Sequence, residues 1–156
     1  MSYVFDTSPF STLFKNYYRR TFRSLWERFD ALVQEGDIVS TREVLRELEE
    51  GPVESAAQWA GQHSALFATP TAAEGAFVGR IYSVTHFQQN IEQRKVLRGG
   101  RCADPFVIAR AAVDDRAVVI VEEFKPNAVK IPNICRHFDI QCLSLEDFME
   151  AEGWKF

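Results

Sequence analysis

Tyr3-Val4-Phe5-Asp6-Thr7-Ser8-Pro9, near the start of this 156-residue chain, predicts a short buried strand that stops at a carboxylate, with a helix start at Ser8-Pro9. A later apolar run, Val118-Val119-Ile120-Val121, is also followed by acids, Glu122-Glu123. The carboxyl ends of parallel strands converge on one crevice. We therefore expect these acids to meet at one edge of a sheet.

Helical patterns separate the two runs. Apolar residues at helical spacing from Phe22 to Val33 predict an amphipathic helix that ends near Gly36, followed by a short strand at Ile38-Val39. Ser40-Thr41-Arg42-Glu43 has the S/T-x-x-E pattern of a capping box, which predicts the start of the next helix. A weak helix is expected over residues 53–67.

Residues 70–74 contain a second capping box, which predicts a long helix from there toward Leu97. Gly99-Gly100 would end that helix, and we expect a mobile loop between Lys95 and Arg101. Asp104-Pro105 predicts another helix, with the aspartate as cap and the proline at the first helical position. After a short helix from Ile131 come a strand over 140–143 and a final helix capped by 144–147.

Strands that alternate with helices predict a three-layer α/β/α fold with a mostly parallel central sheet of four or five strands. The length suits one domain, residues 1–156. Hydrophobic residues make up 46% of the chain and aromatic ones 13%, which suits a packed core and excludes a disordered chain.

Charge and cysteine content narrow the functional classes. The net charge of -4 argues against nucleic-acid binding through bulk positive charge, but it is compatible with a nuclease whose carboxylate cluster binds cations. Cys102, Cys135 and Cys142 have no C-x-x-C spacing, which predicts reduced thiols. Met1-Ser2 leads directly into the first strand, and no apolar run approaches the ~20 residues of a membrane span, so we expect a cytoplasmic protein with no membrane contact.

Each acidic residue also has a structural explanation. Asp6 could be a turn residue, Asp104 could be only a helix cap, and Glu122-Glu123 could be solvated. Glu43 already has a place in the capping box, whereas Glu47, one helical turn further on the same side, is needed by no cap. Together, such carboxylates at strand ends favour a hard divalent cation, because like charges in close contact are stable only when protonated or when a cation is present.

Other chemistries find no support in the sequence. His63, His86 and His137 are scattered without an H-E-x-x-H pattern, which argues against a zinc protease. The sequence has no G-x-S-x-G elbow and no phosphate-binding glycine loop. We interpret Cys135, beside His137, as a buried thiol on a short helix and not as a nucleophile. A phosphatase would need a D-x-D nucleophile, but Ser8 follows Asp6-Thr7.

Four segments, in order and over nearly the whole chain, resemble the four motifs of the PIN-domain nucleases. They are Val4-Phe5-Asp6-Thr7-Ser8, Val44-Leu45-Arg46-Glu47-Leu48, Ala103-Asp104-Pro105-Phe106-Val107-Ile108-Ala109 and Val119-Ile120-Val121-Glu122-Glu123. The resemblance implies that Asp6, Glu47 and Asp104 coordinate one or two Mg²⁺ or Mn²⁺ ions. Glu123 would be the fourth acid, with Glu122 the less favoured choice.

The same resemblance implies a metal-dependent ribonuclease that hydrolyses RNA phosphodiesters, with Ser8 hydrogen-bonded near the metal. Many members carry Thr or Ser two residues before the fourth acid, where this chain has Val121, and this departure puts the second metal site in doubt. Lys95, Arg98 and Arg101, close in sequence to Asp104, are candidates for holding the substrate backbone, or they form a solvated loop.

Many small bacterial PIN domains resemble the VapC toxins of toxin-antitoxin pairs, which implies an antitoxin protein and a homodimer as partners. The alternative is a PIN-like module without turnover that binds or regulates a partner. Val121 favours this alternative slightly, whereas the retention of every acid favours the nuclease.

Overall fold

The structure is a computed structural model that describes residues 1–90 and 102–156. Five strands form one parallel sheet in the order β3-β2-β1-β4-β5. The strands are β1 (Tyr3–Phe5), β2 (Ile38–Thr41), β3 (Phe67–Ala68), β4 (Ala117–Ile120) and β5 (Cys142–Ser144). The chain steps outward from β1 to β3 and then crosses to β4 on the other side. The strand order therefore reverses between β1 and β4, and in open α/β sheets ligands bind outside the carboxyl ends of such strands.

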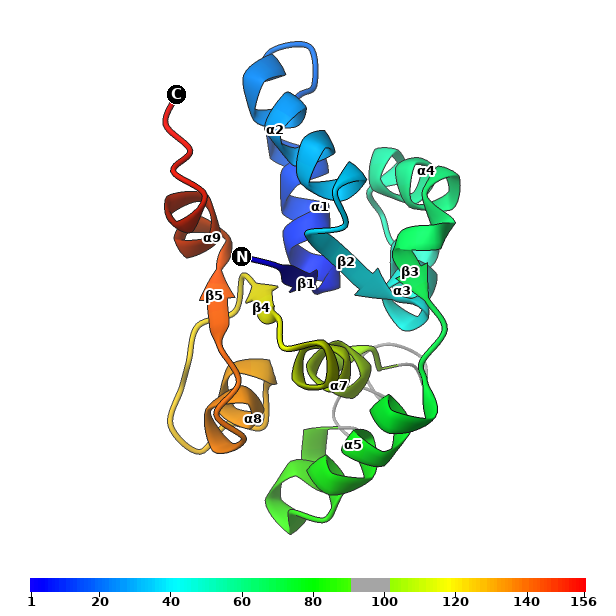
Figure 1. Ribbon diagram of the computed structural model, residues 1–156, viewed down its shortest axis with the longest axis vertical. Helices are drawn as coiled ribbons and strands as arrows, with labels where there is room; N and C mark the ends of the chain where they lie inside the picture. Colours follow the sequence, from blue (N-terminus) through cyan, green and yellow to red (C-terminus); the bar gives the residue numbers. More distant parts are fainter. Residues whose placement is uncertain (91–101) are drawn as a thin grey trace.

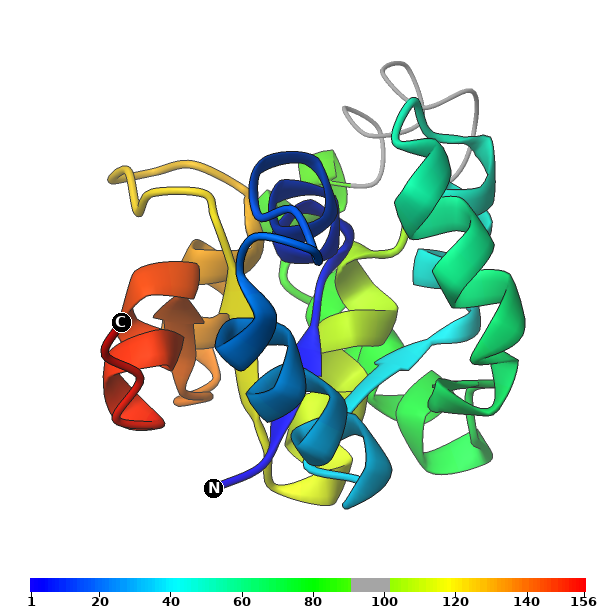
Figure 2. The same ribbon diagram turned by 90° about the horizontal axis from the view of Figure 1, so that it is seen from above.

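Helices cover both faces of this sheet (Figures 1 and 2). Helices α1 and α2 pack on one face together with α9, and α5, α7 and α8 lie on the other, while α3 and α4 flank β2 and β3. Their bounds are α1 (Thr7–Asn16), α2 (Arg23–Gln34), α3 (Arg42–Glu50), α4 (Glu54–Gln62), α5 (Ala72–Tyr82), α7 (Asp104–Asp114), α8 (Ile131–His137) and α9 (Leu145–Ala151). The predicted three-layer α/β/α fold with a parallel sheet is confirmed.

The core is built on the fully buried strands β1, β2 and β4. On the face covered by α1, α2 and α9, each helix brings one aromatic ring against Phe5. The ring centroids of Phe10, Phe29 and Phe148 lie 5.2, 6.3 and 5.0 Å from that of Phe5. Aromatic pairs at such distances add to the stabilisation from burial, so the end of β1 is held rigidly.

The predicted capping box at residues 40–43 is wrong. Strand β2 continues to Thr41 because Ser40 and Thr41 pair with β3, and Ser40 Oγ donates to the Phe5 carbonyl at 2.7 Å. Helix α3 therefore starts at Arg42, and Glu43 pairs with Arg42 and Arg46 instead of capping the helix. Asp104 is likewise the first residue of α7 and not its cap, which is Ala103.

Other boundaries also differ from expectation. Residues 53–67 hold α4, a 3-10 turn at Ser64–Leu66 and the start of β3, so the single weak helix was wrong. The predicted long helix ends at Tyr82, and a 3-10 turn, Thr85–Phe87, follows before residues 88–90 turn helical again. Its expected continuation and the loop 95–101 lie outside the described residues. The last strand spans 142–144 instead of 140–143.

Two capping boxes are confirmed, Thr71 with Glu74 at the start of α5 and Ser144 with Asp147 at the start of α9. In the part of the chain that the structure describes, none of the helices has the length and apolar character needed to cross a membrane.

Candidate active site

Asp6 lies at the point where the strand order reverses. It follows β1 directly, is fully buried, and its backbone N–H donates to the Val119 carbonyl of β4 at 3.1 Å. This bond continues the pairing of β1 with β4 by one residue. The backbone of Asp6 is therefore held by two strands at the crevice where α/β sheets bind ligands.

Asp104, the first residue of α7, is also fully buried. Its Oδ2 accepts a hydrogen bond from Asn90 Nδ2 at 3.1 Å, and the same amide donates to the Val129 carbonyl at 2.7 Å. Cys102 Sγ donates to Asn90 Oδ1 at 3.7 Å. Asn90, itself only 1% exposed, thus fixes the position of one Asp104 oxygen.

Glu47, on α3, connects the surroundings of the two aspartates. Its Oε1 accepts from Thr7 Oγ1 at 2.6 Å, and its Oε2 accepts from the backbone N–H of Ala103 at 3.0 Å. Thr7 is the residue after Asp6, and Ala103 is the residue before Asp104. The two oxygens of one carboxylate therefore tie together the chain segments that carry Asp6 and Asp104.

Cys135 is close enough to Asp6 and Asp104 for their charges to affect its pKa. The pKa of the Cys135 thiol is raised by a hydrogen bond with Cys142, by burial, and then by the negative charges of Cys142, Asp104 and Asp6. The pKa of the Tyr82 hydroxyl is raised by burial and then by Cys102 and Asp104. Both groups stay protonated at neutral pH, so Cys135 is not an activated nucleophile.

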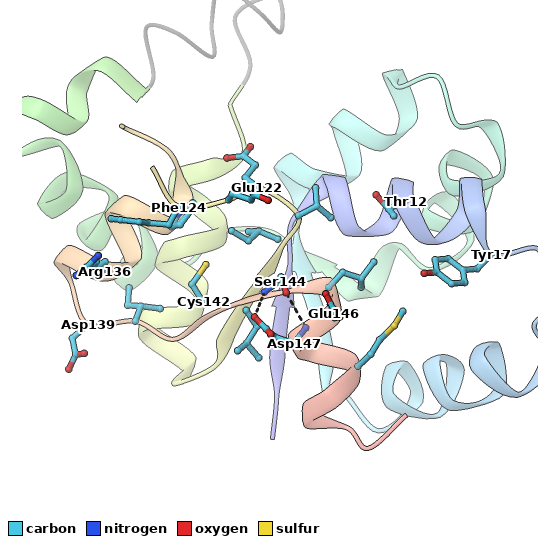
Figure 3. Close-up of a pocket in the computed structure, with 18 residues that line it drawn as sticks. Thr12, Tyr17, Glu122, Phe124, Arg136, Asp139, Cys142, Ser144, Glu146 and Asp147 are labelled. Carbon is cyan, nitrogen blue, oxygen red and sulfur yellow. Dashed lines mark hydrogen bonds between the residues drawn. The ribbon is translucent and has the colours of Figure 1, made fainter. Parts of the chain in front are cut away.

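Glu122 and Glu123 follow β4 and line an open groove of about 1190 Å³ across the carboxyl ends of β4 and β5. Figure 3 shows Glu122 between Phe124 on one side and Thr12 of α1 on the other. Glu122 is partly buried, whereas Glu123 is exposed. The two candidates for the fourth acid thus differ in burial, and the choice between them stays a prediction.

Four further residues were predicted to contact the substrate, Ser8, Lys95, Arg98 and Arg101. Ser8 is the second residue of α1 and partly buried, and the hydroxyl that reaches Glu47 belongs to its neighbour Thr7. Lys95, Arg98 and Arg101 lie outside the described residues. Across residues 1–90 and 102–156, no three or more His, Cys, Asp or Glu side chains form a group that could hold a metal ion.

Sequence reasoning missed Asn90 and the supporting roles of Thr7 and the Ala103 N–H. Thr7 stands inside a segment that had been singled out, so its position next to Asp6 was a usable signal. A single asparagine in a helical stretch gives no comparable signal, because its importance depends on contacts with Asp104 and Val129.

Comparison with solved structures bears on the fold. The crystal structure of VapBC2 from Rickettsia felis bound to a DNA fragment from their promoter is similar over 92% of this chain and 98% of that chain, with a TM-score of 0.52 and 13% sequence identity. At that identity the likeness shows the fold alone. No curated protein matches this sequence. A family model described as a domain of unknown function (DUF4411) matches residues 3–156, and the chain therefore belongs to the DUF4411 family.

Proposed function

We propose that this protein is a metal-dependent nuclease, and specifically a ribonuclease that hydrolyses RNA phosphodiesters. The observation that carries the proposal is the double hydrogen bonding of Glu47, on α3, to Thr7 and Ala103, which joins the segments that carry Asp6 and Asp104. A fold similar to that of the VapBC2 structure supports it. Fold alone does not fix function, so the proposal rests on the acids.

Asp6, Glu47 and Asp104 would hold Mg²⁺ or Mn²⁺, with Glu122 or Glu123 as the further acid. Carboxylate oxygens are the donors that such hard cations prefer, so the chemistry of these side chains fits the ion. When bound, the cation would lower the pKa of a water molecule and stabilise negative charge on the scissile phosphate.

The chain's own residues position the carboxylates in advance. The Thr7 hydroxyl and the Ala103 N–H fix both oxygens of Glu47, and Asn90 fixes one oxygen of Asp104. Such supporting hydrogen bonds orient ligand side chains and typically change activity by about 10- to 100-fold when removed. Contacts of Ser8, Lys95, Arg98 and Arg101 with the substrate backbone remain predictions.

The test is cleavage of single-stranded RNA by the purified protein with Mg²⁺ or Mn²⁺, with and without EDTA. Asp104→Asn should abolish cleavage. Asp115→Asn is the matched control, because Asp115 is exposed, precedes the amino end of β4, and has a φ of 54°, which asparagine tolerates. If a broad panel of RNA and DNA stays intact with either ion, the nuclease proposal fails and a binding or regulatory module takes its place.

We also propose a toxin role with a protein antitoxin and a homodimeric assembly. The similar structure contains VapBC2 bound to promoter DNA, and the shared fold is what supports this step. Induced expression of the wild-type protein should stop cell growth, and Asp104→Asn should not. Co-expression of the protein encoded by the neighbouring gene should restore growth. Equal growth with wild type and Asp104→Asn would remove the toxin role and leave the nuclease proposal to the cleavage assay.

A further inference from the structure

The carboxyl end of α1 leads into a basic aromatic turn, residues 15–23, with the sequence Lys-Asn-Tyr-Tyr-Arg-Arg-Thr-Phe-Arg. These residues contain four of the 18 Lys and Arg of the chain, together with three aromatic rings and no acid. In a protein with a net charge of -4, such a concentration is a local reversal of charge.

Two of the three aromatic side chains of the turn face solvent, and Tyr17 is half-buried. Tyr18 is 64% exposed and Phe22 is 37% exposed. The backbone beneath them is fixed, because the N–H groups of Thr21 and Phe22 both donate to the Tyr18 carbonyl, at 3.0 and 2.8 Å. Trp26 Nε1 also donates to the Tyr17 carbonyl at 2.7 Å. The rings are therefore presented on an ordered surface, which reduces the entropy lost on binding.

The charges of the turn divide into two groups. Arg19 supports the fold, because its guanidinium lies 4.2 Å from the centre of the Trp26 ring and pairs with Asp30 at 3.0 Å. Lys15, Arg20 and Arg23 are exposed, and across the described ranges, 1–90 and 102–156, no carboxylate pairs with them. Each of these three cations thus lies within three residues of an exposed ring in sequence and has no partner carboxylate in the described ranges.

The turn is connected to the candidate active site by α1. This ten-residue helix starts beside Asp6 and is about 15 Å long. Thr12 of α1 and Tyr17, the C-cap of that helix, line the same groove as Glu122, and Figure 3 shows them on one side of it. On its other side Tyr17 lines, with Tyr18 and Arg20, a second hollow of about 900 Å³ between α1, α2 and α4.

We propose that the basic aromatic turn binds single-stranded nucleic acid, with bases stacked on Tyr18 and Phe22 and phosphates held by Lys15, Arg20 and Arg23. Stacking on exposed rings together with a positive surface is how proteins hold single strands without reading sequence. Acids at the active site repel phosphate, so a substrate strand needs positive charge elsewhere, and this turn supplies it. The inference deepens the proposed nuclease function and rests on it for the identity of the bound strand as substrate.

The experiment measures binding apart from cleavage. Fluorescence anisotropy of labelled oligouridylate and oligothymidylate is followed in EDTA with proteins that carry Asp6→Asn. Tyr18→Ala should weaken binding by about fivefold or more, since stacking contributes ~1–3 kcal/mol per base, and Tyr18→Phe should retain it because the ring remains. Arg20→Gln should lower the slope of log affinity against log salt by about 0.7, the value for one phosphate contact on a single strand.

Arg80→Gln is the charge control, because Arg80 is an exposed arginine on α5, at the opposite end of the molecule from the turn (Figure 1). It should leave affinity and salt slope unchanged, and a duplex of the same length should bind more weakly than the single strand. Unchanged affinity in both Tyr18→Ala and Arg20→Gln would overturn the inference and leave an acidic protein as the occupant of the turn. Binding that depends on the turn without any RNA cleavage by the wild-type protein would instead refute the nuclease proposal alone.

Discussion

Helix α1 begins at a buried acidic site and ends at an exposed basic turn. At its amino end, Asp6 is fully buried between β1 and β4, and Thr7 donates to Glu47. At its carboxyl end, Tyr18 and Phe22 are exposed. Lys15, Arg20 and Arg23, close to them in sequence, have no partner carboxylate in residues 1–90 and 102–156. One helix of ten residues thus joins regions of opposite charge and opposite exposure.

The difference follows from what each region is proposed to do. Carboxylates that hold a cation must be fixed in position, which requires burial and hydrogen bonds from neighbours. A surface that holds a flexible strand needs aromatic rings and charges that are accessible from solvent. The separation along α1 also keeps the arginines from pairing with the acids and neutralising them.

The largest expected effect concerns two glutamates on α3. Glu47 is hydrogen-bonded into the site, whereas Glu43 pairs with Arg42 and Arg46 and has a side chain 14% exposed. Glu47→Gln should lower the rate of RNA cleavage by about 100-fold or more, because ligands of a catalytic cation contribute several kcal/mol. Glu43→Gln should retain most of the activity. An equal loss of cleavage rate in both variants, in a steady-state assay, would show that the assignment of Glu47 and not Glu43 to the site is wrong.

A smaller effect is expected for Asn90. Asn90→Ala removes the hydrogen bonds to Asp104 and Val129 and should lower the rate of cleavage by about tenfold, as for other residues that orient ligands. Asn133→Ala is the control, because the Asn133 amide also donates to a backbone carbonyl, that of Lys125, at 2.7 Å. Unchanged kcat in Asn90→Ala would mean that Asp104 holds its position without this amide.

The smallest effect separates a buried tyrosine from an exposed one. Burial, followed by a hydrogen bond of 2.5 Å to Glu152, raises the pKa of Tyr3 above its ordinary value of 10.0. The folded state therefore binds this proton more tightly than the unfolded state, and the stabilisation is complete below about pH 10 and is lost as the pH rises further. Urea unfolding from pH 8 to 11 should show a larger loss in wild type and in Tyr18→Phe than in Tyr3→Phe, in which the raised pKa values of Tyr82 and Cys135 still contribute. A loss of the same size in Tyr3→Phe would assign it to other groups.

Several parts of the fold could be predicted from local patterns, because the decisive interactions are themselves local. The apolar runs gave β1, β2 and β4, and the Thr71–Glu74 and Ser144–Asp147 boxes gave two helix starts. The box predicted at Ser40 failed because pairing with β3 extends β2 through that segment. Strand β3 itself, Phe67–Ala68, is too short to show alternation.

Some residues of the candidate site could also be predicted from local patterns, whereas others depend on contacts between distant segments. An acid after each of two apolar runs indicated that Asp6 and Glu122-Glu123 share one sheet edge. The choice of Glu47 over Glu43 rested on the capping box predicted at residues 40–43, which is wrong, although Glu43 does have other partners in Arg42 and Arg46. No pattern could show that Glu47 reaches Ala103, since 56 residues separate them in sequence. The sequence does not separate Glu122 from Glu123 as a ligand, and the structure adds only that Glu122 is the more buried of the two.

Asp6 and its neighbouring carboxylates are proposed to meet and to bind a divalent cation. Thermal melting of wild type, Asp6→Asn and Asp115→Asn, each in EDTA and in excess Mg²⁺ or Mn²⁺, tests this proposal most directly. The cation should raise the Tm of wild type and of Asp115→Asn, and it should affect Asp6→Asn less. A 100-fold excess of the cation over Kd corresponds to about 2.7 kcal/mol of added stability. Without metal, Asp6→Asn should be as stable as wild type or more so by about 1 kcal/mol, because one repelling charge is gone. A clear destabilisation of metal-free Asp6→Asn, with no response of wild type to either ion, would contradict the claim and make Asp6 a structural residue.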